Sequence, residues 1–414
     1  MKKWKPGDRI PYAGRVYDKT ELKYLREAAD EFWLTEGRWT KRFEKEFSKY
    51  LGINYSIFVN SGSSANLLAF MTLTQPELGN RRIKRGDEVI TTACCFPTTI
   101  APIIQYGAVP VFVDIDIPSY NIDCSQLEKA LSPKTKAIMI AHTLGNPFNA
   151  KEVLEFCIKH DLWLIEDNSD ALGSVCSKVK TGTIGDISTC SFYPAHHMTT
   201  GEGGMVCTGN PELYKIIKSL RDWGRDCICP TGQDNTCGKR FELQKGKLPF
   251  GYDHKYIYSH FGYNLKATDL QAAIGCAQMK KLPKFVEVRR KNWKAIDKAL
   301  RESKAVDYYY LPQEQPYGRA SWFGYVLSVK DVLYTRKNVV KFLEERGIQT
   351  RMLFAGNILL HPCFDNLELN KDYRIIGDLK NSNFVTNNTF WIGVYPGINE
   401  EMLESMTKTL GHLT

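Results

Sequence analysis

The chain has no long apolar run and no apolar leader. No segment reaches the roughly 18 consecutive apolar residues that a membrane-spanning helix needs. The first residues, MKKWKPGDRIPYAG, combine charges with proline and lack the apolar centre of a signal peptide. These absences predict a cytoplasmic protein with no membrane partner.

Positive charge is present but is not concentrated in one place. The net charge is +9 over 414 residues, and lysines and arginines are spread among acids, apart from short clusters such as residues 81–85. A nucleic-acid-binding protein usually carries a basic stripe or patch. We therefore expect no nucleic-acid partner, and the charge balance suits an anionic small substrate or an acidic protein partner.

Repeats and low-complexity linkers are also missing, and strand-like runs alternate with helical patterns. The strand-like runs are DEVITT, VPVFVDI, KAIMIAH, LWLIED and GMVCTG. Between them lie helical patterns such as SANLLAFMTLTQ, CSQLEKALS and AKEVLEFCIKHD. This alternation predicts an α/β protein with a mainly parallel, helix-covered sheet.

The pattern changes near residue 285. Long helical stretches over residues 265–303 lead into the strand-like run WFGYVLSV, the helical run TRKNVVKFLEERG and a terminal helix over residues 400–410. A chain of 414 residues is long enough for two domains. We expect an N-terminal segment and large domain over residues 1–284 and a smaller α+β domain over residues 285–414.

Twelve cysteines are many for a cytoplasmic protein. Most lie in apolar runs such as TTACCF and behave as small core residues, and a reducing compartment disfavours disulfides. Cys227, Cys229 and Cys237 differ, because they lie in the polar segment RDCICPTGQDNTCGKRF. The pattern C-x-C-x7-C in such a segment indicates a metal or cluster loop rather than a core strand.

Two other segments present polar groups at element ends. Residues 60–66, NSGSSAN, follow the apolar run YSIFV and open a helix, where free backbone N–H groups and hydroxyls suit a phosphate. Serine-rich caps are common, so an ordinary helix cap is the alternative. Asp167 ends the run LWLIED and suits either a ligand nitrogen or a capped turn.

Residues 191–204, SFYPAHHMTTGEGG, resemble the active-site segment of the DegT-like sugar aminotransferases and dehydrases. These enzymes have the aspartate-aminotransferase (type I PLP) fold, and a lysine five residues before the GEGG-type turn forms a Schiff base with pyridoxal phosphate (PLP). Here His196 takes that place. A histidine cannot form the imine, but it moves protons near neutral pH. This exchange is similar to that in the 3-dehydrases of 3,6-dideoxysugar pathways, which use pyridoxamine phosphate (PMP).

The same resemblance implies the other cofactor contacts. Asp167 would pair with the pyridinium nitrogen and keep the ring an electron sink. Asp170 stands near the ring hydroxyl, where many aminotransferases have Gln, and Phe96 would stack on the ring, with core packing as its alternative. The implied phosphate contacts are Ser63, Ser64, Ser191 and, from the neighbouring subunit of a homodimer, Asn264.

The segment CGKRF…LPFGYDHKYIYSHFGYNL is similar to the CDP-4-keto-6-deoxyglucose-3-dehydrases, which use PMP and a [2Fe-2S] cluster. Three of the four cluster cysteines of that family match Cys227, Cys229 and Cys237, but the fourth position is Ser169. Thiolates are the usual ligands, and a serine oxygen should weaken the cluster. The cluster could persist with Ser169 or another ligand, it could be labile, or the position could have been altered deliberately.

The resemblance therefore implies C3 dehydration of a nucleotide-linked 4-keto-6-deoxyhexose, with CDP as the expected nucleotide, in lipopolysaccharide O-antigen synthesis. PMP would bind at the C4 ketone, His196 would remove a proton, and the C3 hydroxyl would leave. An NADH-dependent iron–sulfur flavoprotein reductase would then supply electrons through the cluster. The alternatives are a redox-neutral 3-dehydratase that regenerates PMP with glutamate and a catalytically inactive PLP-fold regulator. The missing lysine disfavours an ordinary sugar aminotransferase.

Overall fold

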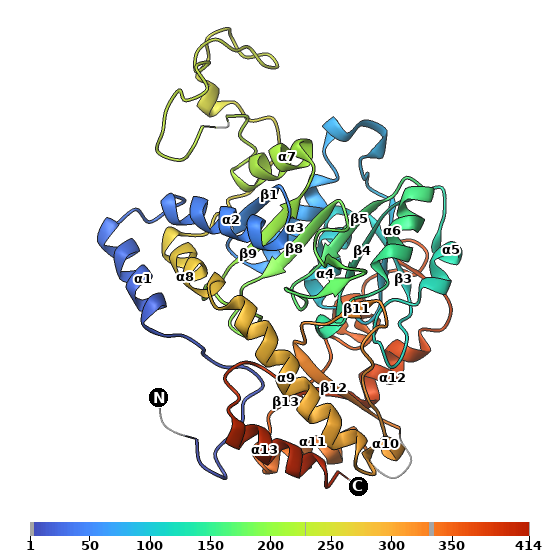
Figure 1. Ribbon diagram of the computed structural model, residues 1–414. Coiled ribbons are helices and arrows are strands. Elements are labelled where there is room, and N and C mark those ends of the chain that lie inside the picture. Colours follow the sequence, from blue (N-terminus) through green and yellow to red (C-terminus); the bar gives the residue numbers. More distant parts are fainter. Residues whose placement is uncertain (1–3, 228, 331–334, 414) are drawn as a thin grey trace.

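An eight-stranded sheet forms the centre of the computed structural model, which describes residues 4–227, 229–330 and 335–413 (Figure 1). The strand order is β1-β9-β8-β5-β4-β2-β3-β14. The strands are β1 (Tyr55–Val59), β2 (Glu88–Thr92), β3 (Val109–Val113), β4 (Thr135–Ala141), β5 (Trp163–Asp167), β8 (Ile187–Ser191), β9 (Gly204–Thr208) and β14 (Arg374–Ile375). The five strand-like runs of the sequence therefore form β2, β3, β4, β5 and β9.

Most of this sheet is parallel, so the α/β fold class is confirmed. The strands from β14 to β8 pair in parallel, while β9 runs antiparallel to both β1 and β8. The direction of β9 follows from its connection, because residues 192–203 join it to its neighbour β8 without a crossover helix. These residues contain His196.

Helices cover both faces of the sheet. On β1, Ile57 and Val59 belong to one apolar core cluster with α3 (Gly62–Thr72) and α7 (Pro211–Arg221). The intervening Phe58 belongs to the opposite cluster, with α2 (Arg38–Leu51) and α8 (Asp269–Met279), as the alternation of side chains along a strand requires. The other helices in this part of the chain are α1 (Lys19–Glu31), α4 (Pro97–Tyr106), α5 (Leu127–Ala130) and α6 (Ala150–Lys159).

A second sheet, β10-β12-β15-β13, is antiparallel and lies at the lower end of the molecule in Figure 1. Its strands are β10 (Tyr309–Tyr310), β12 (Gly324–Val329), β13 (Thr350–Arg351) and β15 (Thr389–Gly393), and the helices of this region are α9 (Leu282–Arg301), α10 (Ala305–Tyr308), α11 (Arg336–Glu345), α12 (Lys380–Asn388) and α13 (Glu400–Leu410). The short strands β6 (Val175–Cys176), β7 (Val179–Lys180) and β11 (Gly318–Arg319) make a third sheet.

The N-terminal residues pack with this second sheet rather than with the large one. Trp4 and Ile10 belong to the same core cluster as Leu343 and Ile392, and Ile10 bridges Ile348. The division at residue 285 falls within the first turn of α9, whose continuous helix runs beside both sheets (Figure 1). The two-domain boundary stays a prediction.

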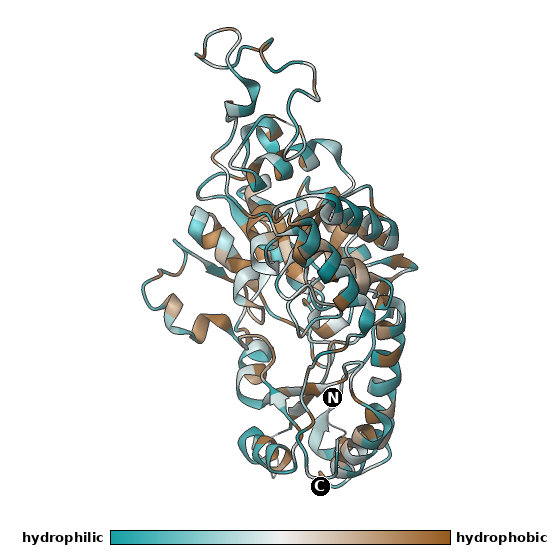
Figure 2. Cartoon of the chain, turned by 90° about the vertical axis from the view of Figure 1, so that its left-hand side faces the viewer, coloured by the Kyte–Doolittle hydropathy of each residue, from teal (hydrophilic) through white to brown (hydrophobic). Residues whose placement is uncertain are grey.

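Residues 225–227 and 229–261 belong to an excursion that projects from the end of α7, at the top of Figures 1 and 2. Its two ends meet at Gly224 and Gly262, where Trp223 N donates to Tyr263 O at 2.6 Å. We call the place where these two ends meet the neck of the excursion. A Cβ on Gly224 would lie 1.9 Å from His260 O, so only glycine fits at this position of the neck. Among the described residues, no helix is long and apolar enough to cross a membrane.

Candidate active site

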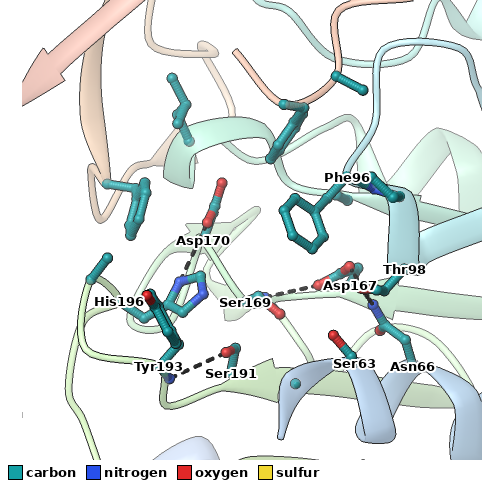
Figure 3. Close-up of a pocket in the computed structure, with 18 of the residues that line it drawn as sticks. Ser63, Asn66, Phe96, Thr98, Asp167, Ser169, Asp170, Ser191, Tyr193 and His196 are labelled. Atoms are coloured by element: carbon teal, nitrogen blue, oxygen red, sulfur yellow. Dashed lines mark hydrogen bonds and ion pairs between the residues drawn. The ribbon is translucent and has the colours of Figure 1, made fainter. Parts of the chain in front are cut away.

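A cavity of about 560 Å³ lies beyond the carboxyl ends of β4 and β5. Ligands of open α/β sheets bind at this edge. The end of β5 contributes Asp167 and Ser169, and the β8–β9 connection contributes His196 (Figure 3). Phe323, which precedes β12, and Trp391 of β15 line the cavity from the second sheet. Residues of the large sheet, of the second sheet and of their connections therefore build the cavity together.

Asp167 is the most firmly held polar group in this cavity. Its Oδ2 accepts hydrogen bonds from Asn66 Nδ2 at 2.9 Å and Thr99 Oγ1 at 2.8 Å, and its Oδ1 accepts one from Ser169 N at 3.2 Å. Thr189 Oγ1 donates to Asn66 Oδ1 at 2.6 Å and fixes the amide. Three donors suit an ionised carboxylate, which only accepts hydrogen bonds.

The beginning of α3 provides an anion cradle beside Asp167. Ser61 caps the helix, because its Oγ accepts from Ser64 N at 3.0 Å, and the first-turn N–H groups have no acceptor within the helix. Ser63 and Ser191 both line the cavity. A Cβ on Gly62 would lie 2.4 Å from Ser191 Cβ, so only glycine lets the two segments close into a cradle.

Ser64 differs from Ser63 and Ser191. Its hydroxyl accepts from Ser61 Oγ at 3.0 Å, and it is not among the side chains that line the cavity. Asn264 is not among them either, and its backbone pairs with Asp222. The predicted reach of Asn264 into a neighbouring subunit stays a prediction.

His196 faces Asp170 across the cavity. The distance from His196 Nδ1 to Asp170 Oδ1 is 3.5 Å (Figure 3), and the His196 ring lies 5.1 Å from that of Phe323. Arg289 Nη2 donates to His196 O at 3.0 Å and holds the backbone of the loop. In the part of the chain that the structure describes, Asp170 Oδ2 and His196 Nδ1 are buried without a hydrogen-bond partner.

Burial sets the charges of this pair. Burial raises the pKa of Asp170 to about 8, and the neighbouring Asp167 carboxylate adds to the rise. Burial lowers the pKa of His196 to about 4, against the opposing pull of Asp167. Between these values the pair carries one proton, on Asp170, and the imidazole is neutral.

Phe96 precedes α4 and projects into the cavity above Asp167 (Figure 3). It is 49% exposed, so its alternative role in core packing does not hold. An exposed aromatic side chain beside a carboxylate and an anion cradle offers a free face on which a planar ring can stack.

The matching family model covers residues 16–411 and describes the DegT/DnrJ/EryC1/StrS aminotransferase family. This chain belongs to that family. The DegT/DnrJ/EryC1/StrS relatives include the lipopolysaccharide biosynthesis protein RfbH of Salmonella typhimurium, 52% identical over 95% of this chain and 89% of that protein. The dTDP-4-dehydro-2,6-dideoxy-D-glucose 3-dehydratase of Saccharopolyspora spinosa is 50% identical over 96% of this chain and 85% of its own.

The fold also matches solved structures of this family. The E. coli GDP-4-keto-6-deoxy-D-mannose-3-dehydratase with bound hydrated PLP superposes with a TM-score of 0.85 at 31% identity, over 97% of this chain and all of that one. The family, the aminotransferase-type fold and the identification as an enzyme are therefore established, and so is the resemblance to 3-dehydratases.

The residues of the cavity fit the PLP and PMP cofactors of this family. The glycine-closed cradle of Gly62 and Ser191 suits a phosphate, Asp167 suits a ring nitrogen, and Phe96 offers a stacking face. The buried Asp170 Oδ2 lines this cavity and has no hydrogen-bond partner among the described residues, so it could take the ring-hydroxyl contact that the resemblance implied for Asp170.

The predicted cluster residues lie in two different places. Cys227, Cys229 and Cys237 line a small pocket in the projecting excursion, whereas Ser169 lines the main cavity beside Asp167. Among the described residues, no three His, Cys, Asp or Glu side chains form a ready metal site. The residues present therefore do not make the four-ligand set that the resemblance implied, and a [2Fe-2S] cluster ligated by Ser169 stays a prediction.

Several residues that line the cavity or hold its lining in place were not assigned a role from the sequence. Thr99 holds Asp167 from the first turn of α4, and Asn66 lies within the segment 60–66 but carried no assigned contact. Arg351, His361 and Trp391 come from the second sheet and its connections. No local motif marks them, because they reach the cavity only through the packing of the two sheets.

Proposed function

We propose that the enzyme catalyses the PMP-dependent C3 dehydration of a nucleotide-linked 4-keto-6-deoxyhexose in 3,6-dideoxysugar synthesis. The observation that carries this proposal is His196, a neutral imidazole in the lysine position of an otherwise intact cofactor cavity. An aminotransferase needs the lysine to hold PLP covalently, whereas a dehydratase needs a base. Relatives at 50% and 36% identity are named as 3-dehydratases.

Each cavity residue then has a defined part. Ser63, Ser191 and the first turn of α3 would hold the phosphate, and Phe96 would cover one ring face. When bound, PMP supplies an amine for the sugar ketone and a ring that accepts electrons. Asp167, fixed by Asn66 and Thr99, would keep the ring nitrogen protonated.

Asp170 and His196 would have different roles, Asp170 as a hydrogen-bond donor and His196 as an acid and base. The Asp170 carboxyl is protonated below about pH 8, so it can donate a hydrogen bond to a ring oxygen, as the Gln of aminotransferases would. With PMP and substrate bound, the neutral His196 imidazole would be the base that accepts a proton and the acid that delivers it to the departing C3 hydroxyl. The ring of Phe323 packs against His196, with 5.1 Å between ring centres, and limits the positions open to the imidazole.

The outer wall of the cavity suits the nucleotide diphosphate. Arg351 lines the cavity, with its guanidinium carbon 4.0 Å from the ring centre of Tyr12, and it supplies positive charge. The relatives are named for dTDP and GDP sugars, so the base remains open and CDP stays a prediction. A nucleotide panel decides this point.

The regeneration of the enzyme has two candidate routes. The cysteine excursion supports electron delivery through a [2Fe-2S] cluster and an NADH-dependent flavoprotein reductase, because three cysteines line one pocket there. Ser169 and the similarity to GDP-4-keto-6-deoxymannose-3-dehydratase, one structure of which has a trapped PLP-glutamate geminal diamine, support redox-neutral regeneration with glutamate. Turnover with glutamate alone, against turnover that requires NADH and reductase, separates the two.

A homodimer would complete the active site. The neck and excursion expose large aromatic side chains, among them Trp223 at 41%, Phe250 at 73% and Phe261 at 100%. Asn264 lies three residues beyond Phe261. A second copy that covers these aromatics would bring Asn264 to the other cavity in an isologous contact.

The test is incubation of the purified enzyme with PMP and each of the CDP, dTDP and GDP 4-keto-6-deoxyhexoses. We expect C3–O cleavage with one of them, and His196→Asn should abolish it while PMP still binds. Transamination at C4 without C3–O cleavage would reject dehydration in favour of an aminotransferase.

A further inference from the structure

The pocket in the projecting excursion contains a histidine that the sequence patterns did not single out. The lining of a cavity of about 10 Å³ includes Cys227, Cys229, Cys237 and His254, and the other lining residues are polar or charged: Gln233, Asp234, Asn235, Arg240 and Lys255. This volume is too small for an organic ligand and suits a single ion or a compact inorganic centre. His254 lies in a short 3-10 turn and is 6% exposed.

His254 is placed as a metal-ligating histidine would be. Its Nδ1 lies 3.9 Å from Cys237 Sγ. A metal with a sulfur at about 2.3 Å and a nitrogen at about 2.0 Å, at a tetrahedral angle, would hold the two atoms about 3.5 Å apart. The observed separation therefore needs little change to place one metal ion between them.

The other ring nitrogen has the partner that such a histidine usually has. His254 Nε2 lies 2.9 Å from Asp226 Oδ2, and Lys245 Nζ and Ser259 Oγ donate to Asp226 Oδ1 at 2.5 and 3.0 Å. A carboxylate on the far nitrogen fixes the ring and raises its basicity as a ligand. Asp226 is also adjacent to Cys227 in the chain.

We propose that His254, oriented by Asp226, is the fourth side-chain ligand of a thiophilic metal centre whose other ligands are Cys227, Cys229 and Cys237. This ligand set lies wholly within the excursion and does not need Ser169, which lines the main cavity. Because the three sulfurs are not gathered at one point among the described residues, binding draws Cys227 and Cys229 towards the Cys237–His254 pair. The proposal is independent of the sugar chemistry.

Cobalt(II) is the probe, added under anaerobic conditions to the reduced, metal-free full-length protein. We expect one Co²⁺ per chain with thiolate charge-transfer absorption. Asp226→Asn should weaken binding about 10- to 100-fold, and His254→Ala should weaken it further. Ser169→Ala should leave it unchanged. The matched control is His260→Ala in the same excursion, because His260 bonds Ser219 and Glu77 and does not line the cysteine pocket.

A rescue variant shows whether weaker binding in His254→Ala comes from the missing ligand or from misfolding of the loop. His254→Cys should restore tight binding and add charge-transfer intensity, because a fourth thiolate replaces the imidazole. Zn²⁺ that displaces Co²⁺ without sulfide uptake would identify a single ion. Two irons and two sulfides, lost in the same variants, would identify a cluster, and both results support this ligand set. No Co²⁺ binding by the wild type, unchanged binding in His254→Ala, or weakening by Ser169→Ala would overturn it.

Discussion

The charge assignment of Asp170 can be tested by its effect on stability. Asp170 in the folded protein holds its proton to about pH 8, whereas an unfolded Asp loses its proton near pH 3.9. The native state therefore binds one more proton than the unfolded state in this interval, and stability falls as pH rises through it. The variant Asp170→Asn removes this proton uptake.

His196 acts in the opposite direction at lower pH. Its pKa is about 4 in the folded protein and about 6.5 when unfolded. Between these values the unfolded state binds the extra proton, so the contributions of the two residues cancel up to about pH 6.5. From there to pH 8 only Asp170 contributes. At about 1.4 kcal/mol per pH unit, the pair then costs on the order of 2 kcal/mol of unfolding free energy.

The assay is urea denaturation of the cofactor-free protein at fixed concentration from pH 6.5 to 8. We expect the wild type to lose about 2 kcal/mol more than Asp170→Asn over this range. The matched control is Glu44→Gln, because burial raises the pKa of Glu44 in α2 to about 7. This control should flatten the curve below pH 7 and leave the decline from 7 to 8.

An infrared spectrum gives a second readout of the same proton. The wild type should show a protonated-carboxyl carbonyl band at pH 7 that disappears through about pH 8 and that Asp170→Asn lacks. Parallel stability curves for wild type and Asp170→Asn, with no such band, would refute the assignment of the proton to Asp170.

The remaining predictions concern the cofactor and assembly. Borohydride should leave cofactor unattached in the wild type, whereas His196→Lys should attach PLP covalently and lose dehydration; mass spectrometry that finds an adduct at a native lysine would contradict this. Phe96→Ala should weaken PMP binding at least about twofold, the lower end of an aromatic stacking contribution, by equilibrium dialysis. Light scattering at micromolar concentration should show a dimer that Phe261→Asp weakens, and a wild-type monomer that binds PMP tightly would count against the shared site.

Much of the large sheet could be predicted from the sequence because its strands are short apolar runs separated by helical patterns. The runs that became β2 to β5 are buried on both faces, which leaves an uninterrupted apolar signal. The direction of β9 could not be predicted, since an apolar run carries no information on its neighbours. The packing of Trp4 and Ile10 with the second sheet depends on contacts distant in sequence.

The candidate site, like the fold, could be predicted only in part from the sequence. Asp167 was predicted from its place at the end of a strand, and His196 was predicted from a motif in a loop. The structure brings both residues to one cavity. Arg351 lines the cavity and Thr99 holds Asp167 from α4, and neither role is visible in the local sequence because both depend on tertiary packing. His254 was missed for a different reason: it lies 17 residues from Cys237, beyond the spacing of a short ligand motif.

The most direct test of the dehydratase account is the fate of the C3 oxygen. Substrate labelled with ¹⁸O in its C3 hydroxyl is incubated with enzyme and PMP, and fragment mass spectrometry follows the label at C3. The account predicts that the label is lost to water with the wild type and retained with His196→Asn at equal PMP occupancy. Complete retention with the wild type, for all three nucleotides, would contradict it.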